Sequence, residues 1–474
     1  MKNMKKLGTA ILSAGVLLSA MPVLPVYAAE TAEPVQMTAT IKLNDTSATA
    51  EGKNVKIDGT KITISASGSY EFSGKLSDGQ IIVNVEDTTL DSETVKLFFN
   101  GVDITGLTAA PVYVINAKNT SINLMDDTEN ILTDGENYGE DTTAVIYAKD
   151  DITIKSGGTT GNGKLKIVAN YQYGIHCNDD VKITGGDIDI KAKSSDGLRG
   201  KTSVEIKGGK LDINADGDGV KSTKGYVIIS GGDTEIKAGK DAVQGETDVT
   251  DSKSGTVHKG VEISGGSLKA NGDRALTNSG GEVLITGGTV FATATKDELK
   301  EGQTEADLKD NTMKISKDST QPILMFNTKV QQAKDQRVEL KPVGGDTAVF
   351  SKNPNKKFDY VLISSPELKV GSKYELYVNN AKTEAGEITI AEGFTTLTDV
   401  VCAVVEDPTE FDPMDMNGDG SVDVSDAVLM ARFYAEDSTV KLRDGALAHM
   451  DVNGDGQYNS LDVTFILKRI AKLA

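Results

Sequence analysis

The chain has 474 residues, and its 50 Lys and Arg against 70 Asp and Glu give a formal net charge of −20. This acidic excess excludes a general nucleic-acid binder, because an acidic surface repels phosphates instead of releasing their counterions. The 38% of hydrophobic residues excludes a disordered chain. The length predicts about two to four domains.

The N-terminal residues predict a secretory signal peptide over residues 1–28. Three lysines precede an apolar run over residues 7–24, and small residues at the cleavage positions end at Ala28. A membrane anchor is the alternative, but the apolar run is short for a bilayer span. We therefore expect a secreted, extracellular protein with no membrane attachment after cleavage.

One short phrase repeats through the middle of the chain. It reads Val-Lys-Ile-Thr-Gly-Gly at residues 181–186, and similar phrases stand at 204–209, 227–232, 261–266 and 283–288. Successive copies start 23, 23, 34 and 22 residues apart, so the third interval holds an insertion, roughly residues 246–258. Apolar and polar residues alternate within each copy, which is the period of a β-strand.

This repetition predicts an all-β body over residues 29–310, built as a right-handed parallel β-helix, or solenoid. A single coil cannot bury its apolar side, so successive coils stack, and parallel crossovers are nearly always right-handed. An antiparallel sandwich is the alternative. Residues 311–395 predict a small antiparallel β cap module that covers the last coil, and residues 396–412 a linker.

Stacking the repeats predicts a column of acids formed by Asp196, Asp218 and Asp241, with Asp273 as a less regular fourth member. Adjacent strands lie about 4.8 Å apart, so these carboxylates repel unless water, a proton or a cation compensates them. Calcium is the hard cation that suits such a column outside the cell. The alternative is a ladder of turns in which each Asp accepts backbone N–H groups.

A second column lies three residues beyond the acids. Arg199, Lys221 and Gln244 form it, and His176 extends it by one coil, with Tyr173 beside it. Hydrogen-bond donors and an aromatic ring along one flank predict a carbohydrate-binding surface. Arg199 and Lys221 are also the candidate catalytic bases.

The C-terminal residues contain a twelve-residue calcium-loop pattern twice. Side-chain oxygens stand at positions 1, 3 and 5, glycine at 6, and a carboxylate at 12. The predicted ligands are Asp415, Asn417, Asp419, Ser421, Asp423 and Asp426 in the first loop, and Asp451, Asn453, Asp455, Gln457, Asn459 and Asp462 in the second. We therefore expect two calcium ions here.

Each loop precedes one amphipathic helix, expected over residues 425–434 and 461–473. This duplicated loop-helix, over residues 413–474, resembles a type I dockerin. The resemblance implies a calcium-folded module that docks to a cohesin of a cellulosome scaffoldin. Carried over by position, the cohesin-binding residues are Val424, Ser425, Arg432, Ser460, Leu461 and Lys468.

Phrases at residues 39–44, 67–83 and 95–104, together with the repeats, resemble a bacterial carbohydrate-binding β-helix family. The resemblance covers most of residues 37–390. It implies a fold similar to that of calcium-dependent pectate lyases, with binding of cellulose and acidic sugars and bound calcium.

We therefore predict a secreted, cellulosome-associated protein that docks to a cohesin and binds plant cell-wall polysaccharide, cellulose or an acidic pectic sugar, on its β-helix flank. The alternative is a calcium-dependent, pectate-type lyase, in which Lys221 or Arg199 removes the proton α to a uronate carboxylate. A scaffold or adhesin is a third hypothesis for the function. Whether the protein is an enzyme is left open, with a non-catalytic role favoured.

Overall fold

The structure is a computed structural model. It describes residues 35–136, 142–246, 248–279, 281–296, 312–402, 414–419, 421–437, 439–442, 446, 450–453, 457 and 459–471. The predicted signal peptide and residues 403–412 of the predicted linker lie outside this part of the chain. Within the described residues, the helices are too short or too polar to span a bilayer.

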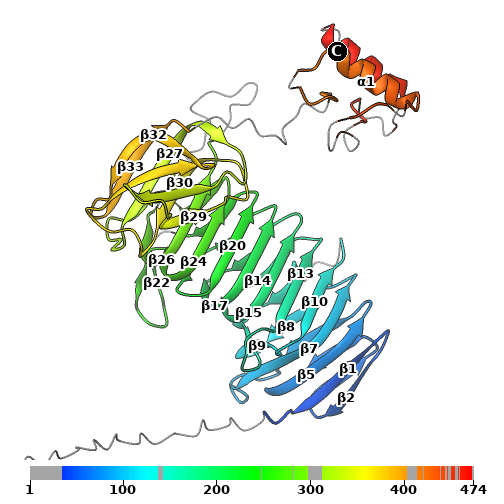
Figure 1. Ribbon diagram of the computed structural model, residues 1–474. Coiled ribbons are helices and arrows are strands. Elements are labelled where there is room, and N and C mark those ends of the chain that lie inside the picture. The colour runs from blue at the N-terminus through cyan, green and yellow to red at the C-terminus, as the bar shows by residue number, and fades with distance from the viewer. Residues whose placement is uncertain are drawn as a thin grey trace, which may run out of the picture. The chain divides into compact units, whose positions relative to one another are not determined.

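The described strands form four sheets (Figure 1). The large sheet has 17 strands, β1 (Ala39–Asp45), β2 (Ala48–Gly52), β5 (Gly68–Leu76), β7 (Thr94–Gly106), β9 (Asn119–Leu124), β10 (Glu129–Asp134), β12 (Ile152–Ser156), β13 (Lys164–Ala169), β15 (Asp180–Ala192), β17 (Ser203–Ala215), β19 (Tyr226–Ile229), β20 (Asp233–Ala238), β24 (Val261–Asn271), β26 (Val283–Ala294), β27 (Ile323–Gln332), β30 (Phe358–Ser364) and β33 (Phe394–Val400).

A second sheet has 10 strands, β3 (Val55–Asp58), β4 (Lys61–Ile64), β6 (Gln80–Asn84), β8 (Val112–Asn116), β11 (Ala144–Ala148), β14 (Tyr173–Cys177), β16 (Leu198–Gly200), β18 (Val220–Ser222), β21 (Asp241–Gly245) and β25 (Arg274–Asn278). The two small sheets are β22 (Val249–Thr250) with β23 (Val257–His258), and β28 (Val338–Pro342), β29 (Phe350–Lys352), β31 (Lys373–Val378) and β32 (Ala381–Thr389).

Equivalent residues of successive repeats pair across parallel strands, as the repetition predicts. Val181 lies opposite Val204, and the same row continues through Val227, Val261 and Val283. These five valines are at most 1% exposed. The stacked aliphatic side chains therefore form one continuous hydrophobic core along the repeats, here called the repeat body.

Four of the five Gly-Gly pairs of the repeated phrase lie inside long strands, β15, β17, β24 and β26, whereas Gly231 and Gly232 lie between β19 and β20. β15 pairs with β12 through its first residues and with β13 through its last, and its register with β17 shifts between Thr184 and Asp187. Gly209 occupies the equivalent bend in β17 with φ +86°, and a Cβ there would lie 2.7 Å from the Gly186 carbonyl oxygen. The close approach of neighbouring repeats therefore requires glycine at the bend.

The predicted fold class, a right-handed parallel β-helix solenoid with a separate antiparallel cap module, is wrong. β26 of the last repeat pairs antiparallel with β30, and β27 pairs antiparallel with β30 and parallel with β33, so these strands belong to the same large sheet as the repeats. β1 and β2 are antiparallel as well. The result is a mixed all-β sheet, because the chain covers the open edges of the repeats by adding strands of either direction.

The antiparallel-sandwich alternative also fails, because the repeats pair in parallel. Residues 323–402 contribute a second hydrophobic core around Phe291, Phe326 and Phe358. Phe291 belongs to the last repeat, so this core joins the repeat body to the strands that follow it.

The C-terminal module contains two helices, α1 (Val424–Tyr434) and α2 (Ser460–Ile470). Asp423 and Asn459 are their N-caps, and each helix has a capping box with Asp at its third position. Met416, Met430 and Ile466 are fully buried in its core. Both helices begin one residue earlier than the sequence predicts.

Candidate functional site

A continuous row of side chains faces away from the core on the 10-stranded sheet. Strand pairing places its members opposite one another on β8, β11, β14, β16, β18 and β21. We call this set the outward row: Tyr113, Tyr147, His176, Arg199, Lys221 and Gln244. Its last four members are the predicted second column, so the structure brings these predicted residues together.

One end of the outward row is aromatic. The Tyr113 and Tyr147 ring centroids are 5.5 Å apart, and those of Tyr147 and His176 are 5.3 Å apart. Tyr173 lies beside His176 with a centroid distance of 5.1 Å. Asn178 donates a hydrogen bond of 3.1 Å to the Tyr147 hydroxyl, which orients that ring. The rings, which are tilted or edge-on to one another, with Tyr113 8% exposed, therefore form one connected aromatic group across three strands, here called the platform.

His176 enters this platform as a neutral ring. Burial, followed by the nearby Arg199 charge, lowers the pKa of His176 to about 4. Its Nδ1 lies 2.7 Å from the Thr143 hydroxyl. At neutral pH the imidazole is therefore an uncharged aromatic surface held by a hydrogen bond.

The other end of the outward row carries two cations, and each pairs with a buried acid. Arg199 donates to Asp196 at 3.0 Å and to the Tyr173 hydroxyl at 3.1 Å. Lys221 donates to Asp218 at 2.5 Å. The side chains of Arg199 and Lys221 are 27% and 23% exposed, whereas those of the two acids are only 6% and 5% exposed. The positive charge of this end is therefore largely compensated.

The predicted acidic column lies in register beneath these cations. The Asp218 amide donates to Asp196 at 3.0 Å, and the Asp241 amide donates to Asp218 at 3.0 Å. Arg274 donates to both oxygens of Asp241, at 2.7 and 2.6 Å. Burial raises the pKa of Asp241, while the hydrogen bonds from Arg274 oppose that rise.

These contacts match the ladder-of-turns alternative, because each carboxylate accepts from a backbone amide, a cation or both. They give no support to calcium at Asp196, Asp218 and Asp241, which stays a prediction. Asp273, the irregular fourth member, has a side chain 52% exposed and pairs with Lys356 at 3.1 Å.

The sequence analysis missed Tyr113, Tyr147 and Thr143. Tyr113 precedes the copies of the repeated phrase, whereas Tyr147 stands five residues before the irregular copy at residues 152–158, as His176 stands five residues before Val181. That spacing was the available signal for Tyr147, and the short apolar run with one Tyr over Val112–Asn116 was the available signal for Tyr113.

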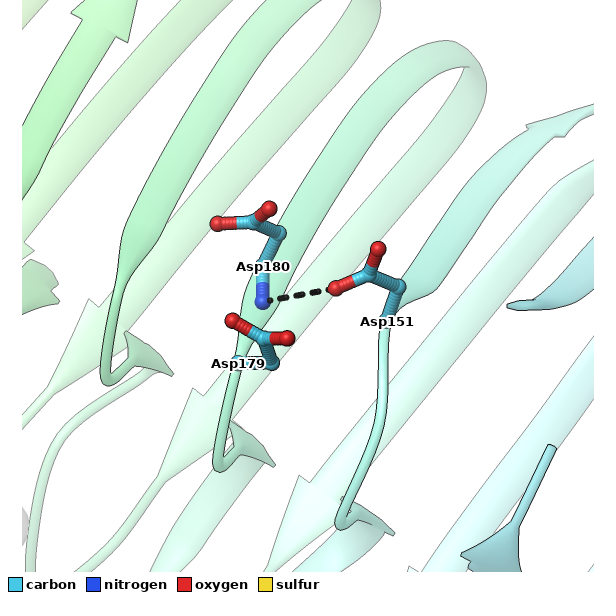
Figure 2. A group of neighbouring side chains, drawn as sticks. All are labelled: Asp151, Asp179 and Asp180. Atoms are coloured by element: carbon cyan, nitrogen blue, oxygen red, sulfur yellow. Dashed lines mark hydrogen bonds between the residues drawn. The ribbon is translucent and has the colours of Figure 1, made fainter. Parts of the chain in front are cut away.

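A separate acidic group lies at the start of the strands of the large sheet. One carboxylate oxygen from each of Asp151, Asp179 and Asp180 lies within 4.8 Å of the other two (Figure 2). The Asp180 amide donates to Asp151 at 3.2 Å. Lys253 lies 2.7 Å from Asp180 and 3.5 Å from Asp151 and compensates this group.

The first C-terminal loop gathers oxygen atoms in the way that a hard cation requires. Asp415 and Asp426 are 1% and 0% exposed. Asp426 accepts from the amides of Met416 and Asn417, at 2.8 and 3.1 Å, which folds the loop back onto α1. Two buried carboxylates in an all-oxygen loop fit calcium, which would compensate their charge.

The second loop follows the same plan, with Asp462 fully buried and accepting from the Asn459 amide at 2.9 Å. Asp455 lies outside the described residues. Asp423 and Asn459 serve as helix caps, since Asp423 accepts from the Ser425 amide at 2.7 Å and Asn459 from the Leu461 amide at 2.8 Å. Hydrogen bonds from Ser425 lower the pKa of Asp423. As caps, these two residues are less direct candidates as ligands than the remaining positions.

The predicted cohesin-binding residues lie on the two helices, and several are exposed. Val424 and Leu461 are 56% and 58% exposed. Arg432 pairs with Asp437 at 2.8 Å. The sequence analysis did not single out Val428 and Leu467, which are exposed apolar residues one helical turn or more further along.

A family model described as a carbohydrate-binding domain-containing protein matches residues 58–316, more than half of the chain. The chain belongs to this family. The match contains the whole outward row. A second model, the type I dockerin domain, matches residues 413–471, which identifies the C-terminal module. Type I dockerins are calcium-binding modules and components of cellulosomes.

Two proteins illustrate what the chain is similar to. A protein of the same description from Acetivibrio thermocellus is 43% identical over 138 residues, which are 28% of this chain and 45% of that relative. The chain thus spans less than half of the relative's length. A solved structure titled as the polysaccharide lyase-like protein from C. thermocellum, a gadolinium derivative, is 33% identical and covers 51% of this chain and 97% of its own, with a TM-score of 0.42.

Proposed function

We propose that this protein is a secreted cellulosome component that docks to a cohesin of a scaffoldin and binds plant cell-wall polysaccharide on the outward row. The observation that carries the binding proposal is the connected platform of Tyr113, Tyr147 and His176. The type I dockerin domain carries the docking proposal.

The platform suits a polysaccharide because of its chemistry and its repeat. Aromatic rings bury the apolar face of a sugar ring and leave their polar edges for hydrogen bonds. Strands in the sheet are about 4.8 Å apart, a spacing similar to the repeat of an extended pyranose chain. Successive sugars of one chain would therefore meet successive members of the row.

The compensated charges favour a neutral glucan, such as cellulose, over a densely acidic pectic chain. Arg199 and Lys221 each pair with a buried carboxylate, so they present hydrogen-bond donors with little net charge. The formal net charge of −20 adds a general repulsion toward polyuronates. Donors of this kind are well suited to sugar hydroxyls.

The lyase alternative is not favoured by any contact that we observe among the described residues. A base must present an unprotonated nitrogen, whereas the Lys221 ammonium donates to Asp218 at 2.5 Å. Arg199 is engaged in the same way with Asp196.

In the dockerin domain, Asp415, Asn417, Asp419 and Asp426 of the first loop would hold one calcium ion, and the corresponding residues of the second loop would hold another. Calcium supplies the charge compensation that folds each loop onto its helix. The exposed faces of α1 and α2, with Val424 and Leu461, would then contact the cohesin.

The binding proposal is tested by pull-down and affinity electrophoresis with the full chain, in calcium, on cellulose and on polygalacturonate. Tyr147→Ala removes the central ring of the platform and is expected to weaken cellulose binding about tenfold. Tyr377→Ala, in the separate four-stranded sheet, is the matched control. Equal binding by both variants and the wild type would overturn the proposal.

Ultraviolet absorbance of unsaturated product, followed in the same samples, tests the lyase alternative. We expect no increase with polygalacturonate. An increase that Lys221→Ala abolishes would establish the lyase in place of the binder.

A further inference from the structure

The insertion between two repeats forms a hairpin that folds along the repeat body. Val249 and Thr250 of β22 pair with His258 and Val257 of β23. Asp251 orders the tip, because it accepts from the Lys253 amide at 2.8 Å and from the Ser254 hydroxyl at 2.6 Å. We call residues 248–259 the strap.

The tip of the strap reaches back across neighbouring repeats. Asp180, Ser203 and Tyr226 stand opposite one another at the starts of β15, β17 and β19. The chain enters the strand beside Tyr226 directly after the strap. Lys253 at the tip of the strap nevertheless lies 2.7 Å from Asp180. Two strand spacings separate these positions, about 10 Å, so the strap crosses the middle repeat.

The acidic group at the far end requires a cation, and Lys253 supplies it. Asp151, Asp179 and Asp180 lie close enough for their negative charges to destabilise one another. Burial, followed by the Asp180 charge, raises the pKa of Asp151. The hydrogen bond to Asp180 raises the pKa of Lys253, so the ammonium stays charged in this contact.

The strap covers an aromatic ring of the large sheet. The Tyr226 and His258 ring centroids are 4.0 Å apart, and Tyr226 is only 6% exposed. Burial, followed by the Asp251 charge, raises the pKa of Tyr226 to about 12. Because both His258 and Asp251 belong to the strap, the enclosure of Tyr226 depends on the position of the strap.

We propose that the strap is a latch, held closed by the Lys253 contact with Asp151 and Asp180, and that its opening uncovers the Tyr226 ring. The Lys253 side chain is 60% exposed, whereas that of Asp180 is 9% exposed, so solvent and salt reach this contact from the lysine side only. The strap is therefore poised between closed and open states. It controls a surface on a different sheet from the outward row.

Hydrogen exchange of the full chain, at constant calcium, tests the latch through the amides of residues 248–259. Lys253→Met is expected to speed their exchange about fivefold, in line with the loss of one half-exposed ion pair. Lys259→Met is the matched control, since Lys259 pairs at 3.2 Å with Asp248 of the strap itself and lies 4.0 Å from the exposed Asp318, far from the acidic group at the tip. The control should leave tip exchange unchanged.

Nitration by tetranitromethane, quantified by peptide mass spectrometry, reports the exposure of Tyr226, with Tyr377 as the reference in the same molecule. Lys253→Met should raise the Tyr226 to Tyr377 ratio several-fold. A salt series on the wild-type protein needs no variant. One-molar sodium chloride should raise strap exchange and Tyr226 nitration, because the Debye length falls to about 3 Å.

Unchanged strap exchange and Tyr226 nitration in Lys253→Met, or equal changes in Lys259→Met, would overturn the latch. So would a wild-type strap that does not respond to salt. Polysaccharide binding at the outward row is measured separately, so failure of one proposal leaves the other standing.

Discussion

The repeat body and the dockerin domain both bury aspartates, but they compensate the buried charge differently. In the repeat body, Asp218 pairs with Lys221 of its own turn and accepts a hydrogen bond from a backbone amide of the next repeat. In the dockerin domain, Asp426 accepts amides of its own loop, and the remaining oxygens fit calcium. The first arrangement is complete within the protein, whereas the second depends on an ion.

The largest expected effect of this difference comes from removing calcium. Chelation should unfold the dockerin domain and abolish cohesin binding, because structural metal sites contribute folding free energy directly. The repeat body should keep its β-sheet signal. Far-ultraviolet circular dichroism and cohesin pull-down in matched calcium and chelator samples measure both effects. A dockerin domain that stays folded without calcium would contradict the proposed difference in calcium dependence between the two regions.

A smaller loss is expected from breaking one compensated pair in the repeat body. Asp218→Ala leaves the Lys221 ammonium and the Asp241 amide without their acceptor, and should lower the free energy of unfolding by about 2–4 kcal/mol. Asp273→Ala, at an exposed member of the same column, should cost less than about 1 kcal/mol. Urea denaturation of both variants in chelator compares them. Equal losses would show that burial of the pair does not matter.

Acid should destabilise the repeat body through protonation of His176. Its pKa is about 4 in the folded protein, against an ordinary value of 6.5, so the unfolded chain binds more protons between these values. Without solvent screening, this pKa difference corresponds to a fall of about 2.6 kcal/mol in the free energy of unfolding as the pH drops from 6.5 to 4. Screening of the partly exposed ring reduces the expected fall to about 1–2 kcal/mol, with little change above 6.5. His176→Gln should remove this part of the pH dependence. A parallel decline in both proteins would contradict it.

The smallest effect is expected for salt on glucan binding. Because Arg199 and Lys221 are already paired, cellulose affinity should change by less than about twofold between low and high sodium chloride. Affinity electrophoresis across a salt series, at constant calcium, measures this. A steep decline with salt would show that net positive charge drives binding.

Several parts of the molecule follow from local sequence. The repeated Val-x-Ile-x-Gly-Gly phrase predicted the strand rows, and strand pairing confirmed that His176, Arg199, Lys221 and Gln244 align. The duplicated loop predicted the dockerin domain, which the family match confirmed. Both are periodic signals, and a period can be recognised in the sequence without knowledge of the fold.

Other parts were not predictable in this way. The aromatic end of the outward row lies in irregular repeats: Tyr113 has no copy of the phrase to align it, and Tyr147 precedes a copy that contains an extra residue before its Gly-Gly pair. The mixed large sheet was missed because β30 and β33 join it from distant sequence, where strand direction has no local signature. The same holds for Lys253, which contacts Asp180 across 73 residues.

Sequence alone determined which residues repeat, which loops carry calcium-type ligands and where the acidic charge lies, because these depend on spacing and composition along the chain. Tertiary structure decided which charges are compensated and which rings are covered. Those properties arise only when distant segments meet, as Lys221 meets a buried Asp218 and the strap meets Tyr226.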